Sequence, residues 1–184
     1  MKILGIATSP RKGANSQSLV EHVLAGAKKA GAKTELVRIC DLDIAPCTGC
    51  STCKEKGECI IDDDMGNLWE KMAKADAIVL GSPVYWGRLN AQAYPFIDRF
   101  YAYMKPDFST DMPKGKKIVL ALTCGGMPPE AIAPINAYVK STFAFLGCTD
   151  GGYICQNQCL EPRDLTKFPE TIKKAEELGK SLTK

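Results

Sequence analysis

The sequence has little of what a hydrolase, a membrane protein or a nucleic-acid-binding protein needs. Histidine occurs once, at His22 and away from the polar loops, which excludes a Ser-His-Asp or Cys-His hydrolase. No apolar stretch approaches membrane-spanning length, and the N-terminus lacks a secretory signal pattern. The net charge is only +3, and no basic run accompanies it. We therefore expect no nucleic acid and no membrane among the partners.

Cysteine, in contrast, is abundant. The chain has nine cysteines, and an odd count without a secretory signal argues against a disulfide framework. This composition predicts a reducing compartment, and the cytoplasm is the expected location. Four of the cysteines fall within residues 47–59, so they are analysed as one motif below.

The order of apolar runs predicts one α/β domain over residues 1–184. Strands alternate with helices, which predicts a doubly wound parallel sheet with helices on both faces. For five strands the flavodoxin-like order 2-1-3-4-5 is the natural arrangement. The expected strands are residues 2–8, 34–39, 77–81, 117–123 and 148–155. The expected helices are residues 17–30, 62–75, 91–104, 130–146 and 169–182.

The loop after the first strand has the composition of a phosphate-binding loop. Residues 9–18 combine hydroxyls, amides and Arg11, and they lead into a helix with Asn15 or Ser16 as its expected N-cap. Free backbone N–H groups and the positive end of the helix dipole would converge there. The segment lacks the Gly-Lys-Ser/Thr ending of a Walker loop and is not Gly-x-Gly-x-x-Gly. The alternative is a polar turn that only caps the helix.

A second loop brings two aromatic residues to the same edge of the predicted sheet. Residues 82–87, Ser-Pro-Val-Tyr-Trp-Gly, follow the third strand, whose carboxyl end should lie beside the phosphate loop. A flat heteroaromatic ring binds against aromatic or peptide faces and takes backbone N–H groups at its edge. The alternative is that Tyr85 and Trp86 are ordinary core aromatics.

The cysteine-rich segment at residues 46–62 predicts a metal centre. Cys47, Cys50 and Cys53 stand at every third position, and Cys59 supplies a fourth thiol. A Cys-x-x-Cys-x-x-Cys loop can wrap three corners of an iron–sulfur cubane, and Cys59 would close the same site. Structural zinc fits less well, because it usually uses two separated Cys-x-x-Cys pairs. A thioredoxin-type redox pair remains possible but leaves two cysteines unexplained.

The other cysteines give weaker signals. Cys40 and Cys148 are expected as small core residues. Cys124 borders the predicted ligand site. Cys155 and Cys159 lack further ligands nearby in the sequence and are interpreted as structural.

Together the two polar loops resemble those of the flavodoxin-like NADPH-dependent FMN reductase superfamily. The resemblance is carried by Ser9-Pro10-Arg11 with Gly13-Ala14-Asn15-Ser16, and by residues 82–87 followed by Asp98-Arg99 as part of a flavin-ring segment. Combined with the cysteine run, it is specifically similar to the iron–sulfur flavoprotein family. That likeness implies a [4Fe-4S] cluster on Cys47, Cys50, Cys53 and Cys59, and FMN in the sheet-end pocket. It also implies a homodimer or homotetramer and a ferredoxin-like electron donor.

The sequence therefore predicts an FMN-dependent oxidoreductase that passes electrons between a one-electron carrier and a small-molecule acceptor. No side chain is needed as an acid or base, so no catalytic residue is predicted. A cluster-free NAD(P)H-dependent FMN or quinone reductase is the first alternative. A flavin-binding redox sensor with a zinc or disulfide loop is the second. The predicted FMN-binding residues are Ser9, Arg11, Asn15, Ser16, Gln17, Ser18, Pro83, Val84, Tyr85, Trp86, Gly87, Thr123 and Gly125.

Overall fold

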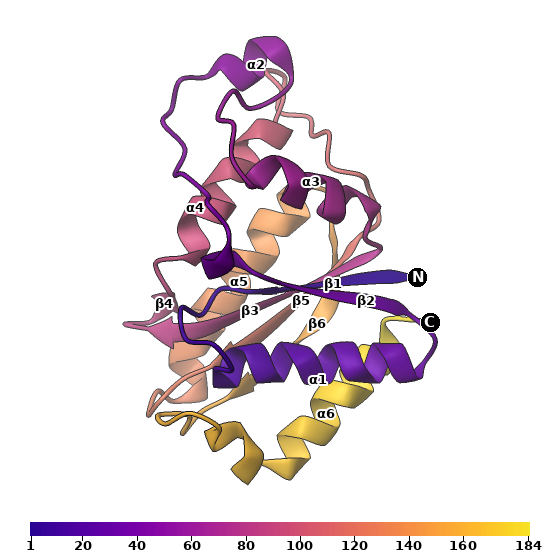
Figure 1. Cartoon of the computed structure of the whole chain (residues 1–184), viewed down its shortest axis with the longest axis vertical. Coiled ribbons are helices and arrows are strands. Elements are labelled where there is room, and N and C mark those ends of the chain that lie inside the picture. The colour runs from indigo at the N-terminus through magenta and orange to yellow at the C-terminus, as the bar shows by residue number, and fades with distance from the viewer.

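A computed structural model describes residues 1–184, apart from the side chain of Pro129. The sheet runs β2-β1-β3-β5-β6, with all of these neighbours parallel (Figure 1). Its main strands are β1 (Lys2–Ala7), β2 (Lys33–Arg38), β3 (Ala77–Tyr85), β5 (Lys117–Thr123) and β6 (Thr149–Gln156). Counted along the chain, these five have the predicted order, and the predicted fold class is confirmed.

Helices cover both faces of the sheet, as Figure 1 shows. They are α1 (Asn15–Lys29), α2 (Thr52–Lys56), α3 (Met65–Lys74), α4 (Ala93–Asp98), α5 (Pro129–Phe145) and α6 (Pro169–Ser181). Short 3₁₀ turns span Ile39–Asp41, Arg99–Tyr103 and Asp164–Lys167. None of the described helices is both long and apolar enough to cross a membrane.

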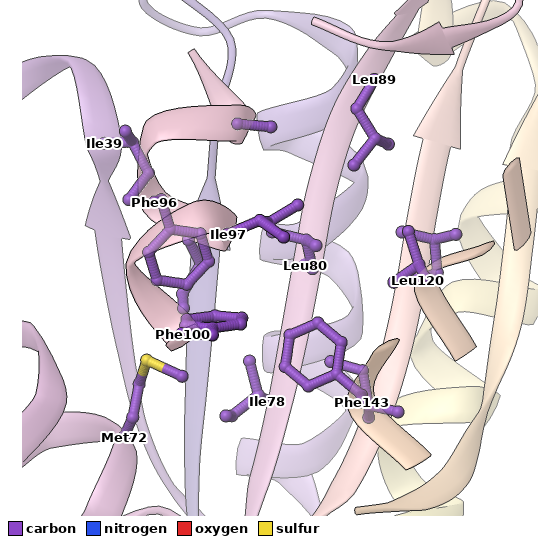
Figure 2. Close-up of a cluster of buried hydrophobic side chains, with 14 of the residues drawn as sticks. Ile39, Met72, Ile78, Leu80, Leu89, Phe96, Ile97, Phe100, Leu120 and Phe143 are labelled. Atoms are coloured by element: carbon purple, nitrogen blue, oxygen red, sulfur yellow. The ribbon is translucent and has the colours of Figure 1, made fainter. Parts of the chain in front are cut away.

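Two hydrophobic cores follow from the period of two in the strands. Ile78 and Leu80 face α3, α4 and α5, while Ala77 and Val79 face α1 and α6. Figure 2 shows the first core, where the Phe100 ring lies 4.7 Å from the Phe96 ring and 5.3 Å from the Phe143 ring, centroid to centroid. The central strands β1, β3 and β5 are thus buried on both sides, which is why their runs are mostly apolar, whereas the edge strand β2 alternates with exposed polar residues.

The structure corrects the third strand. Residues 82–85, predicted as loop, continue β3 to Tyr85. Ser82 and Pro83 extend the parallel pairing with β5, whereas Val84 and Tyr85 pair antiparallel with β4 (Arg88–Leu89), a two-residue strand that was not predicted. Trp86 and Gly87 form the turn with φ of 54° and 72°. Two successive left-handed residues are typical of a tight type I′ hairpin, in which Gly87 is unstrained.

Two helices and one cysteine also differ from expectation. The helix expected over residues 91–104 is split into α4 and the 3₁₀ turn Arg99–Tyr103. The helix expected from residue 62 begins at Met65, because the Asp63 carboxylate accepts a hydrogen bond from the Met65 N–H instead of joining the helix. Cys40, predicted as core, is exposed and donates its thiol proton to the Thr8 carbonyl.

Candidate functional site

A cavity of about 900 Å³ opens at the carboxyl ends of β1, β3 and β5. This is the point where the strand order reverses, and it is where doubly wound folds bind ligands. The volume is that of a site for a cofactor-sized molecule. The lining residues are Ser9, Arg11, Ala14, Asn15, Ser16, Pro83, Val84, Tyr85, Trp86, Gly87, Thr123, Cys124, Gly125, Gly126, Met127, Cys159 and Leu160.

Ser16 is the most informative residue of the loop after β1. It lies in the first turn of α1, is 1% exposed and lines the cavity, yet its hydroxyl has no hydrogen-bond partner among the described residues. No described side chain caps α1, and its first turn has no acidic residue. No side chain of this loop therefore acts as the cap of α1 among the described residues. The N-terminus of α1 presents free donors to the cavity, as an anion site does.

Three neighbours of Ser16 are placed differently from the sequence-based expectation. Ala14, and neither Asn15 nor Ser16, is the N-cap of α1. Asn15 instead donates to the Glu161 carbonyl and accepts from the Leu165 N–H, which ties the loop to the C-terminal segment. Gln17 and Ser18 do not line the cavity, and the side-chain Oε1 of Gln17 accepts a hydrogen bond from the Arg38 guanidinium.

The β3–β4 hairpin forms another wall of the cavity. Tyr85 is 51% exposed and Trp86 is 95% exposed, so neither is a core aromatic. Both line the cavity at the turn of the hairpin. Large exposed aromatic faces beside a polar loop are suited to stacking on a flat ring.

A buried hydrogen-bond network that was not predicted holds this hairpin against the loop after β1. The side-chain Oδ1 of Asn90 accepts from the Thr8 and Ser82 hydroxyls, and its side-chain Nδ2 donates to the Thr8 backbone carbonyl at 2.7 Å. All three side chains are fully buried. Only the proximity of β1, β3 and β4 in the fold reveals this role, since Asn90 lies outside both sequence motifs.

The segment after β6 closes the remaining side and was also missed. Cys159 and Leu160 line the cavity, and the Cys159 N–H donates to the Cys124 carbonyl at 2.9 Å. Burial, together with the Asp164 carboxylate, raises the pKa of Cys159 to about 12, and burial also raises the pKa of Cys124. Both thiols are therefore neutral at pH 7, and this wall carries no charge.

The four clustered cysteines line a second, separate hollow. Cys47, Cys50, Cys53 and Cys59 are all free thiols on its wall, beside Arg99 and Tyr101. Hydrogen bonds from Thr52 and then Thr48 lower the pKa of Cys50, which favours the thiolate that binds metal. Across residues 1–184 as described, no three His, Cys, Asp or Glu side chains are grouped closely enough to hold a single metal ion. A lone zinc would need its sulfurs about 3.8 Å apart, from Zn–S bonds of about 2.3 Å.

Arg99 belongs to this hollow, whereas the sequence resemblance associated it with the flavin ring. Its guanidinium pairs with the Asp63 carboxylate, with Nη1–Oδ2 and Nη2–Oδ1 distances of 2.6 and 3.2 Å. Burial acts to raise the pKa of Asp63, but hydrogen bonds from Arg99, Ala45 and Met65 outweigh it and hold that pKa below its ordinary value. The ion pair is almost fully buried.

A comparison with known protein families gives one match that covers most of the chain. The family described as NADPH-dependent FMN reductase matches residues 1–152. The chain belongs to this family. The prediction of an FMN-dependent oxidoreductase is thereby confirmed at the level of the family.

Iron–sulfur flavoproteins are among the sequence relatives of this family member. One from Methanosarcina thermophila is 39% identical over 126 residues, covering 68% of this chain and 64% of the relative. One from Methanocaldococcus jannaschii is 43% identical over 99 residues, covering 54% of this chain and 51% of the relative. The resemblance to iron–sulfur flavoproteins is confirmed, although the chain spans less than two thirds of the length of either relative.

Solved structures agree on the fold. An FMN-dependent NADH-azoreductase from Bacillus anthracis in complex with FMN superposes with a TM-score of 0.75, 17% identity and full coverage of both chains. At that identity the similarity concerns the fold alone.

Proposed function

We propose that this protein is an iron–sulfur flavoprotein oxidoreductase, with FMN in the cavity and a [4Fe-4S] cluster on Cys47, Cys50, Cys53 and Cys59. The observation that carries the proposal is that four free thiols line one hollow in a chain of the FMN reductase family. Four thiolates are the ligand set of a cubane, and the four free thiols of this hollow supply that set. Donor and acceptor would be a ferredoxin-like carrier and a small molecule.

The residues that line the cavity fit FMN in two respects. The unpartnered Ser16 hydroxyl and the N-terminus of α1 offer hydrogen-bond donors for a phosphate. The Arg11 guanidinium adds a positive charge and can donate two hydrogen bonds at once. Tyr85 and Trp86 offer faces for the ring system, and the hairpin backbone offers its N–H groups. We assign Ser9, Arg11, Asn15 and Ser16 to the phosphate side, and residues 83–87 with Thr123 and Gly125 to the ring side.

The protein's own contribution is to bind, orient and separate the two groups. When bound, FMN supplies one- or two-electron transfer and the cluster supplies one-electron transfer. The described linings of the cavity and of the hollow share no residue, and α2, beside the cysteines, lies at one end of the long axis, away from the hairpin with β4 that forms a wall of the cavity (Figure 1). We therefore favour a homodimer or homotetramer in which sites of different subunits approach each other. Nine free thiols suit a reducing compartment, and we place the protein in the cytoplasm.

Anaerobic purification followed by iron, sulfide and flavin analysis tests the proposal. We expect about four irons, four sulfides and one FMN per chain, as four thiolate ligands predict. Sedimentation of the same sample gives the oligomer size. FMN without iron after cluster reconstitution would exclude the cluster and favour the NAD(P)H-dependent reductase to which the family's name points. Zinc in place of iron would favour the redox sensor.

Ser16→Ala should weaken FMN binding selectively. A hydrogen bond to a charged group contributes about 1.5–3 kcal/mol, so we expect the Kd for FMN to rise about 10- to 100-fold. Riboflavin lacks the phosphate, and its Kd should not change. Fluorescence titration of the apoprotein with both flavins measures the difference.

Ser18→Ala is the matched control, because Ser18 is two residues away on the same helix but does not line the cavity. It should bind both flavins as the wild type does. Equal weakening of FMN and riboflavin by Ser16→Ala would contradict the phosphate assignment.

A further inference from the structure

Arg99 is the only charged side chain of the described structure that is both fully buried and part of the wall around the four cysteines. It is 1% exposed and begins the 3₁₀ turn Arg99–Tyr103. Its two-pronged pairing with Asp63 neutralises the charge within the interior. Buried pairs of this kind are expensive to desolvate and often contribute no net stability, so a different role has to be considered.

The ion pair of Arg99 and Asp63 contacts the chain at both ends of the cysteine-rich segment, residues 46–62. Arg99 Nη1 donates to the Ala45 carbonyl at 3.0 Å, and Nη2 donates to the Ile61 carbonyl at 3.4 Å. The Asp63 carboxylate accepts from the Ala45 N–H and the Met65 N–H, each at 3.0 Å. The chain therefore enters and leaves residues 46–62 at the same ion pair. Because both ends are already held, the segment loses less conformational entropy when it closes around a ligand.

The Nε–H of Arg99 donates no hydrogen bond within the described chain. Both terminal nitrogens of the guanidinium are engaged, but Nε is buried and has no partner in the described chain. Leaving a buried donor unsatisfied costs about 1–3 kcal/mol, more for a charged group, so such a group calls for an explanation. Arg99 and Cys59 both line the hollow around the four cysteines, so a group bound there would lie next to the guanidinium.

We propose that Arg99 is a positioning residue for the cluster. Together with Asp63 it preassembles residues 46–62, and its free Nε–H donates to the Cys59 thiolate or to a sulfide of the cluster. This inference rests on the proposed function, since it needs a cluster on the four cysteines. Hydrogen bonds to cluster sulfurs stabilise the more negative reduced form and raise the reduction potential.

Arg99→Lys tests both the preassembly of residues 46–62 and the hydrogen bond to the cluster, because lysine keeps the positive charge but lacks the planar guanidinium with its several N–H donors. In the apoprotein, amides of residues 46–62 should exchange hydrogen at least tenfold faster than in the wild type. In the reconstituted protein, the cluster should become harder to reduce by about tenfold in the equilibrium constant, which is about 59 mV for one electron. Hydrogen exchange with mass spectrometry and a redox titration followed by EPR give the two readouts.

Two further variants complete the experiment. Lys74→Met removes one positive charge from an exposed pair at the end of α3 and should change neither readout. The double variant Arg99→Met with Asp63→Asn leaves no unpaired buried charge, so it should fold even if Arg99→Lys does not. It should show the same faster exchange and the same lower potential.

The outcomes separate this inference from the proposed function. A wild-type protein that binds no iron overturns the proposed function and the hydrogen-bond half of the inference together. Iron-loaded Arg99 variants with wild-type exchange and wild-type potential overturn the inference and leave the proposed function intact. Faster exchange with an unchanged potential refutes the hydrogen bond to the cluster.

Discussion

Asp63→Asn is expected to lower the free energy of unfolding by about 3–5 kcal/mol, because it leaves a buried guanidinium without its counter-charge. The Arg99 and Asp63 side chains are 1% and 4% exposed, so water cannot replace the lost partner. Asparagine keeps an oxygen that can accept a hydrogen bond from a backbone N–H. The decrease in unfolding free energy therefore measures mainly the removal of the negative charge. Urea denaturation at pH 7 measures the effect.

The difference in unfolding free energy between the wild type and Asp63→Asn should depend on pH. The pKa of Asp63 is lowered in the folded protein, so its contribution is present above the unfolded-state pKa of about 3.9 and is lost as the pH falls through the folded-state value. The difference between wild type and Asp63→Asn should therefore be constant from pH 5 to 7 and shrink below pH 4. Asp62→Asn, an exposed neighbour, should stay within about 0.5 kcal/mol of the wild type. A constant difference down to pH 2.5 would contradict the role of the ion pair.

Gly179→Ala is expected to be strongly destabilising, because Gly179 lies where the helices α1 and α6 approach each other closely. A Cβ at Gly179 would lie 1.9 Å from the Val23 carbonyl oxygen, and a Cβ at Gly26 would lie 1.9 Å from the Glu176 carbonyl oxygen. Figure 1 shows the two helices together on one face of the sheet, and backbone atoms cannot move aside as a flexible side chain can. We expect the free energy of unfolding to fall by about 3 kcal/mol, which is the upper end of the range for overpacked cores. For a chain of this size, that corresponds to a decrease of about 6–12 °C in Tm.

Gly66→Ala is the matched control for this prediction. Gly66 lies within α3, and a Cβ there would meet nothing within 4 Å. Alanine is the better helix former by about 1 kcal/mol, so this variant should be slightly more stable than the wild type. Thermal unfolding of both variants decides the matter, and similar Tm values for the two would refute the close approach of α1 and α6.

The arrangement of the sheet could be predicted from the sequence because it depends on local patterns. Residues 77–80 and 118–122 are continuous apolar runs, and such runs between helical patterns specify buried parallel strands. The loops that follow the strands then meet at one edge, so the approach of Ser16 to Trp86 was predictable without coordinates. The spacing of Cys47, Cys50 and Cys53 is equally local, and it predicted one shared site.

The boundaries of the loops could not be predicted, because pairing between strands decides them. Residues 82–85 look like a loop, since Ser-Pro-Val-Tyr contains a turn residue and follows a glycine. They are strand because Ser82 and Pro83 continue the parallel pairing with β5, and because β4 returns around Trp86 and Gly87 to pair with Val84 and Tyr85. Pairing with neighbouring strands outweighs the local preference of these residues.

The partner of each polar side chain was decided by tertiary structure alone. Asn15 has the composition of a helix cap, yet it binds Leu165, 150 residues away along the chain. Arg99 follows α4, near a motif that resembles a flavin-binding segment, yet it pairs with Asp63 under the cysteine segment. The sequence by itself determined which residue types carry the chemistry and at which strand ends they stand, because periodicity and spacing act over a few residues. Only the tertiary structure decided which atoms they bind, because burial forces each polar group to find a partner wherever the fold brings one.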